Sequence, residues 1–256
     1  MRNPTRRNRN IGTSNQGHGS DNKLSIPTHA HESKDFYERI GKYEKIRRII
    51  NGHAFVFVVE TTRKSCVHAC SVMDVERIIE NISATDYGDL KWIIFRQPKR
   101  KEQILSLVWG RLIYSYEFED NYDTAIILEA VDCTKKISWN KSQTPDDQRE
   151  FERLKNDGHR FVENRKNFSC DVDLEYVRNT QLYRTLLHEF GHYVHYKQIA
   201  GKIKDDESVD EWEKRINMYA QILKHEKERY AHNYADKIRQ KLTKEGIIPF
   251  DRIISR

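Results

Sequence analysis

The stretch TLLHEFGHYVHY, from Thr185 to Tyr196, sets two histidines four residues apart, with a glutamate directly after the first. In a helix, side chains four residues apart lie one turn above each other, with about 5–6 Å between their Cβ atoms. His188 and His192 can therefore close on one metal ion, while Glu189 points about 100° away from His188. The pattern predicts a helix that carries two metal ligands and a separate carboxylate beside them.

Zinc is the metal that this arrangement favours, because neutral imidazoles bind it in a tetrahedral shell. Bound zinc lowers the pKa of a water molecule from about 15.7 to about 7, and a neighbouring carboxylate can then take the proton. We therefore expect zinc (Zn2+) as the cofactor, His188 and His192 as metal ligands, and Glu189 as the catalytic general base.

The residues around this motif indicate that the helix is buried. Leu187, Phe190 and Val194 recur at the spacing of one apolar helix face. Gly191 costs about 1 kcal/mol relative to alanine inside a helix, which indicates that a neighbouring backbone passes close to it. Gly201 is the expected end of a helix that begins near Val177.

The third ligand does not follow directly in the chain. A second glycine and a third histidine are expected in one zinc-peptidase pattern, but His195 and Gln198 stand at those positions. A glutamate from the next helix is the alternative, and Glu228 precedes small and apolar residues that would let two helices approach closely. Glu228 is the predicted ligand, with Glu226 as its main rival. The remaining candidates in the same segment are His225, His232 and Asp236.

At this point the chain resembles the gluzincin-type zinc peptidases, and above all the small intracellular ones of the ImmA/IrrE kind. The resemblance rests on H-E-F-G-H, followed after 36 residues by E-x-x-A-x-x-Y-A, and it covers roughly residues 184–238. It implies a twisted sheet, an active-site helix beneath it, and a C-terminal helix that delivers a glutamate ligand. Carried over by residue, His188, His192 and Glu228 match the ligands and Glu189 matches the base.

Two departures from that family concern the substrate rather than the metal. A charged insertion, GKIKDDESVDEWEKR, separates the two motifs, and no N-terminal helix-turn-helix domain is evident.

Composition predicts one folded domain with a polar leader. Of the 256 residues 37% are hydrophobic and 33% charged, enough apolar material for a core under a charged surface. Residues 1–33 are rich in Asn, Ser, Gly and Arg without periodicity, and predict a disordered basic leader. We expect residues 34–256 to form a single zincin-like domain.

The same leader lacks the apolar core of a secretion signal, and no run of 18 apolar residues suggests a membrane span. A cytoplasmic location without a membrane partner is therefore expected. The four cysteines show no paired metal knuckle and are expected to be reduced thiols.

A net charge of +6 raises the question of nucleic-acid binding. The basic residues gather in the leader and in RQPKRK, from Arg96 to Lys101, without a recognisable nucleic-acid motif. A protein or peptide substrate is the expected partner, and nucleic acid is a secondary possibility through the basic tail.

Hydrophobic periodicity predicts an α+β domain whose strand-rich part (53–140) precedes a helical metal-binding part (145–242). A small, twisted, mainly antiparallel sheet is expected. The expected helices cover residues 36–50, 71–82, 144–158, 177–200 and 210–242, the last with a break near 224–227. The expected strands cover residues 53–60, 91–95, 111–118 and 124–131, the third with clean alternation.

Together these patterns predict a zinc-dependent peptidase. A tyrosine or histidine is expected to stabilise the oxyanion, with His195, Tyr230 and Tyr234 as candidates. The alternative is a zincin-like regulatory or nucleic-acid-binding protein with a structural or vestigial zinc site.

Overall fold

The structure is a computed structural model that describes residues 39–99 and 108–254. The predicted leader, residues 1–33, lies outside the described residues, as does the end of the basic cluster. Within the described part of the chain, no helix is both long and apolar enough to cross a membrane.

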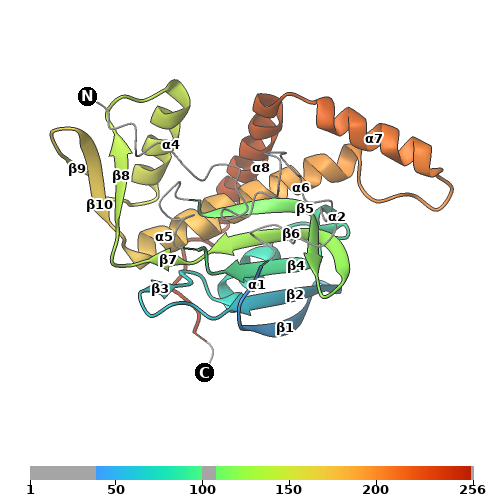
Figure 1. Cartoon of the computed structure of the whole chain (residues 1–256), viewed down its shortest axis with the longest axis horizontal. Coiled ribbons are helices and arrows are strands. Elements are labelled where there is room, and N and C mark those ends of the chain that lie inside the picture. Colours follow the sequence, from blue (N-terminus) through green and yellow to red (C-terminus); the bar gives the residue numbers. More distant parts are fainter. Residues whose placement is uncertain (1–38, 100–107, 255–256) are drawn as a thin grey trace, which may run out of the picture. The chain divides into compact units, whose positions relative to one another are not determined.

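A five-stranded sheet in the order β1-β2-β4-β6-β5 forms the centre of the α+β domain (Figure 1). Its strands are β1 (Tyr43–Ile50), β2 (His53–Glu60), β4 (Trp92–Arg96), β5 (Gly110–Phe118) and β6 (Asn121–Glu129). The β1–β2 and β5–β6 pairs are antiparallel, whereas β2–β4 and β4–β6 are parallel.

The sheet is therefore mixed, and the expectation of a mainly antiparallel sheet is wrong. The reason lies in the connections between strands. The chain leaves β2, forms two helices and returns beside β2 as β4, which is the crossover that parallel neighbours require. It then places β5 at the outer edge, and β6 returns between β5 and β4.

The predicted helix over residues 36–50 is also wrong where the structure describes it, because Tyr43–Ile50 forms strand β1. Its isoleucines fit a helical period, but Asn51 and Gly52 form a two-residue turn with φ of 50° and 80°. Such a turn directs the chain back on itself and pairs Ile50 with His53 in a hairpin. The strand-rich part thus begins ten residues earlier than expected.

Strand β5 does not alternate as predicted. Its pairing with β6 shifts register between Ile113 and Tyr116, so the strand carries a bulge there. Leu112 packs against the core under one face of the sheet, whereas Tyr116 is buried in a cluster on the other face. The bulge therefore reverses the side on which the later residues of the strand lie.

The helices largely follow the sequence periodicity. They are α1 (Val72–Ile79), α2 (Ala84–Tyr87), α4 (Pro145–Asn156), α5 (Leu174–Thr180), α6 (Leu186–Ile199), α7 (Val209–Gln221) and α8 (Lys224–Lys244). As predicted, Thr144 caps α4, Pro145 is its first residue, and Gly158 follows its end with a φ of 110°. The predicted break in the last helical segment is confirmed, and lies just before Lys224.

Short strands complete the described part of the chain. β3 (Cys66–Val67) pairs with β7 (Val131–Asp132), and β8 (Lys136–Asn140), β10 (Asn167–Asp171) and β9 (Val162–Glu163) form a separate small sheet. The part predicted as helical therefore contains two strands. Phe168 and Trp139 from this small sheet stack on Phe151 of α4, which explains why the sheet forms there.

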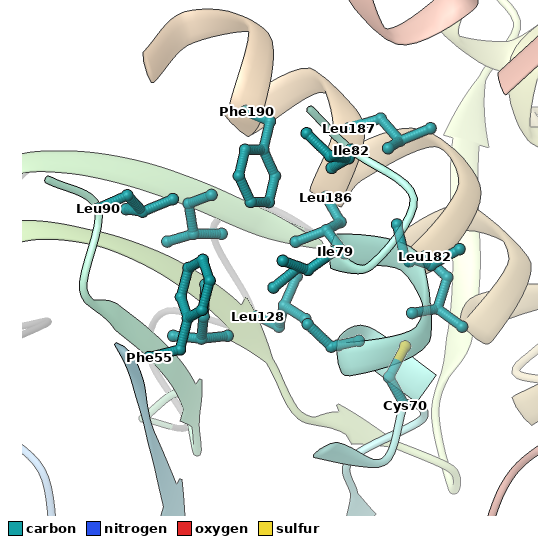
Figure 2. Close-up of a cluster of buried hydrophobic side chains, with 14 of the residues drawn as sticks. Phe55, Cys70, Ile79, Ile82, Leu90, Leu128, Leu182, Leu186, Leu187 and Phe190 are labelled. Atoms are coloured by element: carbon teal, nitrogen blue, oxygen red, sulfur yellow. The ribbon is translucent and has the colours of Figure 1, made fainter. Parts of the chain in front are cut away.

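One face of the central sheet packs on α1 and α6 (Figure 2). Leu186, Leu187 and Phe190 of α6 are fully buried in this core, together with Phe55 of β2 and Leu128 of β6. Burial of each such side chain stabilises the fold by about 1.5–3 kcal/mol. The predicted apolar face of the motif helix is confirmed, and it fixes α6 against the sheet.

The cysteines behave as expected from the sequence, whereas Arg96 does not. All four cysteines are free, as expected. Arg96, assigned above to a basic surface cluster, is only 1% exposed, and its guanidinium lies 2.7 Å from Glu129. It belongs to the interior rather than to a basic surface.

Candidate metal centre

The motif helix does not run smoothly from α5 into α6. Gln181–Thr185 forms a π-helical turn between them, and α5 begins at Leu174 rather than near Val177. The amide nitrogen of buried Gln181 donates hydrogen bonds to the carbonyl oxygens of Trp109 (2.9 Å) and Glu129 (2.7 Å). The turn is thereby tied to the start of β5 and the end of β6, which places α6 along the edge of the sheet (Figure 1).

The predicted ligand atoms lie close together just beyond that turn. The Nε2 atoms of His188 and His192 are 3.0 Å apart, and Glu228 Oε2 lies 3.3 Å and 3.7 Å from them. Tetrahedral zinc with bonds of 2.0–2.1 Å separates its ligand atoms by about 3.3–3.4 Å. The three side chains are 14%, 13% and 39% exposed, so solvent reaches the site. The donor set and its spacing fit a zinc ion.

Glu228 reaches the histidines because α8 passes very close to α6. A Cβ on Gly191 would lie 2.8 Å from both the Cα and the carbonyl oxygen of Ala231 and 3.1 Å from Tyr234 Cβ. The expected close approach of a neighbouring backbone is confirmed. Glu228 lies one turn before Ala231 on α8, which brings its carboxylate over the two imidazoles.

The other acidic and histidine candidates on α8 do not share that position. Glu226 lines a pocket with His195 and Tyr230, on the face of α8 away from Glu228. His225 and Asp236 are exposed. Of the two glutamates left open by the sequence, Glu228 therefore faces His188 and His192.

His232 is the fourth potential ligand at the site. Its ring centroid is 4.3 Å from that of His188, and His188, Glu228 and His232 could also hold a metal ion among them. However, its Nε2 accepts a hydrogen bond from Arg153 Nη1 at 3.1 Å. Burial, followed by the charges of His188 and Arg153, lowers the pKa of His232 to about 3. His232 is thus a neutral ring held beside the ligands.

Hydrogen bonds lower the pKa of Glu228, whereas burial raises the pKa of Glu189. Hydrogen bonds with His188 and His192 lower the pKa of Glu228 and keep it ionised. Burial raises the pKa of Glu189, which is 8% exposed, while the two histidines and the backbone amide of Leu112 act in the opposite direction. The pKa values of Glu228 and of the neighbouring Glu189 are therefore shifted in opposite directions.

Two tyrosines that the sequence did not assign to the site pack on α6 beside Tyr196. Tyr114 of β5 and Tyr219 of α7 place their hydroxyl oxygens 2.7 Å apart. Apart from its first residue, α7 lies within the helix predicted over residues 210–242, and only its first half belongs to the charged insertion. A stripe at helical spacing could have indicated which face of this helix is buried. That stripe consists of Trp212, Arg215, Ile216 and Tyr219.

The oxyanion candidates named from the sequence have other roles in the structure. Tyr234 donates a hydrogen bond to Asp86 at 2.8 Å, and the Tyr230 hydroxyl bonds to Gln198 at 2.9 Å. His195 stacks on the Tyr230 ring at a centroid distance of 4.2 Å. Neither tyrosine hydroxyl is directed at the metal ligands.

No protein-family model, curated protein or solved structure matches the chain.

Proposed function

We propose that the chain is a zinc-dependent peptidase built on a zincin-like core. The observation that carries the proposal is the spacing of 3.0–3.7 Å among the ligand atoms of His188, His192 and Glu228. Buried Glu189 follows the first ligand directly, and edge strand β5 lies against the same helix. This combination of three ligands and a separate carboxylate beside the last strand of the sheet supports peptide hydrolysis.

Each residue of the site then has a defined task. His188, His192 and Glu228 hold the zinc ion, which when bound supplies a Lewis acid and lowers the pKa of water. Glu189 accepts the proton of the attacking water and later donates it to the leaving nitrogen. Because Glu189 must be ionised to act as a base, activity should fall as the pH drops through its raised pKa.

The substrate is an extended peptide or protein segment. Among the described residues, β5 is the last strand of the sheet, next to β6. An exposed strand edge binds an extended peptide through main-chain hydrogen bonds, and such binding tolerates many side chains. Leu112 of this strand contacts Glu189 through its backbone amide, so a peptide bound there would pass beside the base.

The decisive experiment compares zinc content and peptide hydrolysis in matched variants. Glu189→Gln should keep one zinc ion per chain by elemental analysis. It should cut peptides of a casein digest about 10²–10⁴-fold more slowly, measured by mass spectrometry. His188→Ala should lose both zinc and activity. Glu226→Gln, on the far face of α8, is the control and should behave like the wild type. Full activity in Glu189→Gln would remove the assigned base.

The proximity of His232 to His188 favours a second candidate function, a zincin-like regulatory or nucleic-acid-binding protein. If His232 were a fourth ligand, the site would resemble structural zinc sites, which fill all positions with protein side chains. His232→Ala would then weaken zinc binding by at least tenfold. Wild-type protein that binds zinc, cuts no peptide and binds DNA in a salt-dependent manner would favour this alternative.

A further inference from the structure

Tyr219 is held beside the metal ligands by a set of aromatic contacts. It is 5% exposed and is the one buried residue of α7. Its ring lies 5.2 Å from Tyr196 and 5.4 Å from His195, measured between centroids. These two residues form the turn of α6 that directly follows His192, about 5 Å further along the helix axis.

Tyr114 joins Tyr219 to the strand that lies over Glu189. Its ring packs at 4.6 Å from Tyr196, and its hydroxyl oxygen is 2.7 Å from that of Tyr219. Tyr114 lies two residues after Leu112, whose amide contacts Glu189. The hydroxyl pair therefore spans from β5 to α7 on the side of the site that follows His192.

One proton of this hydroxyl pair remains available to a third partner, because each hydroxyl can donate only once. Burial raises the pKa of Tyr114, and its hydrogen bond to Tyr219 raises it further. Burial also raises the pKa of Tyr219, but there the hydrogen bond acts in the opposite direction. Either hydroxyl can donate within the pair, and the hydroxyl that accepts then keeps its own proton for another partner.

The proposed base Glu189 and the proposed ligand Glu228 both lie within electrostatic range of the pair. The charge of Glu189 contributes to the pKa shift of Tyr114, and the charge of Glu228 to that of Tyr219. A hydroxyl that already accepts a hydrogen bond is a stronger donor, since linked hydrogen bonds polarise one another. The pair is thus suited to an oxygen that gains negative charge between these two glutamates.

We propose that the Tyr114 hydroxyl donates to the Tyr219 hydroxyl, and that Tyr219, positioned in this way, donates a hydrogen bond to the substrate carbonyl oxygen during peptide hydrolysis. The inference rests on the proposed peptidase function. As water attacks the carbonyl carbon, a C–O bond forms and the π electron pair moves onto the carbonyl oxygen. When that pair returns, the C–N bond breaks and the nitrogen takes a proton from Glu189. The Tyr219 proton stays on Tyr219 throughout.

Tyr219→Phe tests this role because it removes the hydroxyl and keeps the ring that packs on α6. With the casein-digest peptide that the wild type cuts fastest, kcat should fall about 10²–10³-fold, as for loss of one oxyanion donor, with KM nearly unchanged. Tyr114→Phe should lower kcat by about tenfold, because it disturbs the position of Tyr219. Tyr230→Phe, whose hydroxyl bonds to Gln198, is the matched control and should leave both constants unchanged.

A binding measurement separates this role from a structural one. The same peptide with a phosphinate in place of the scissile amide should bind Tyr219→Phe more weakly by the factor lost in kcat, by calorimetry. The unmodified peptide should bind equally well to the inactive Glu189→Gln variant and to the double variant Glu189→Gln/Tyr219→Phe. A wild type that cuts peptides no faster than Tyr219→Phe overturns this inference alone. A zinc-loaded wild type that cuts no peptide overturns the peptidase function as well.

Discussion

At the scale of single residues, the site depends on two small side chains as much as on its ligands. Gly191 and Ala231 allow the backbones of α6 and α8 to approach so closely that a Cβ at position 191 would overlap backbone atoms. Backbone atoms cannot rotate away as a flexible side chain can. The glycine therefore determines the distance at which Glu228 meets the histidines.

We expect Gly191→Ala to destabilise the protein despite the better helix propensity of alanine. The gain of about 1 kcal/mol from propensity is opposed by overpacking, which costs about 1–3 kcal/mol or more where backbone must shift. Urea unfolding should show a net loss of stability, and zinc affinity should fall because α8 moves outward. Asn233→Ala, on the exposed face of α8, should leave both unchanged. Equal stability of Gly191→Ala and wild type would mean that the helices can separate at no cost.

At the scale of elements, local sequence signals determined the helices α4 and α6, whereas neighbouring segments determined strand β1. The capping box of α4 and the apolar stripe of α6 are encoded within a few residues, and both form as predicted. Strand β1 is different, because the same isoleucine spacing suits a helix. The adjacent Asn-Gly turn and the unpaired edge of β2 decide in favour of a strand.

Gly52→Ala tests how much this turn contributes. Gly52 has a φ of 80°, and no atom lies within 4 Å of the position that a Cβ would take. Any loss therefore comes from backbone strain alone, and we expect about 1–2 kcal/mol in urea unfolding. Asn51→Gly relieves the other left-handed position but removes the hydrogen bonds from the Asn51 side chain to the Glu80 carbonyl oxygen and the Tyr87 hydroxyl. It should therefore also destabilise the protein. If the Gly52→Ala variant were as stable as the wild type, the turn would not be held in this conformation.

At the scale of the whole domain, one buried ion pair joins segments that are far apart in the sequence. Arg178 Nη2 of α5 lies 2.9 Å from Asp74 Oδ1 of α1. The same two side chains also bond to the backbone of Phe250 and Ile253 near the end of the chain. Burial alone raises the pKa of Asp74, but hydrogen bonds from Arg178, Ile253 and Ser71 outweigh it and lower that pKa.

Asp74→Asn should therefore destabilise the domain at neutral pH by about 3–5 kcal/mol, since it leaves the Arg178 charge buried without a partner. A carboxylate with a depressed native pKa stabilises the fold above its unfolded pKa of about 3.9 and loses this effect as the pH falls through the native value. The difference between variant and wild type should accordingly shrink below about pH 4 in urea unfolding. Asp236→Asn, exposed on α8, is the control. A pH-independent difference would contradict the assigned ionisation.

The sequence by itself determined those features that depend on neighbours within one or two turns of chain. These are the motif helix with His188, Glu189 and His192, its buried face, the caps of α4, and most strands of the sheet. Periodicity and capping act locally, so they can be read without knowing what each element packs against.

Only the tertiary structure decided which elements meet. It brought Glu228 rather than Glu226 to the two histidines and made two strand pairs parallel. It also turned residues 43–50 into a strand and brought Tyr219 to Tyr114 across 105 positions of the sequence. A helix or strand pattern defines which face is apolar but not which partner covers it. That choice depends on close packing between distant segments, as at Gly191 and Ala231, where backbone contact rather than pattern brings the third ligand into place.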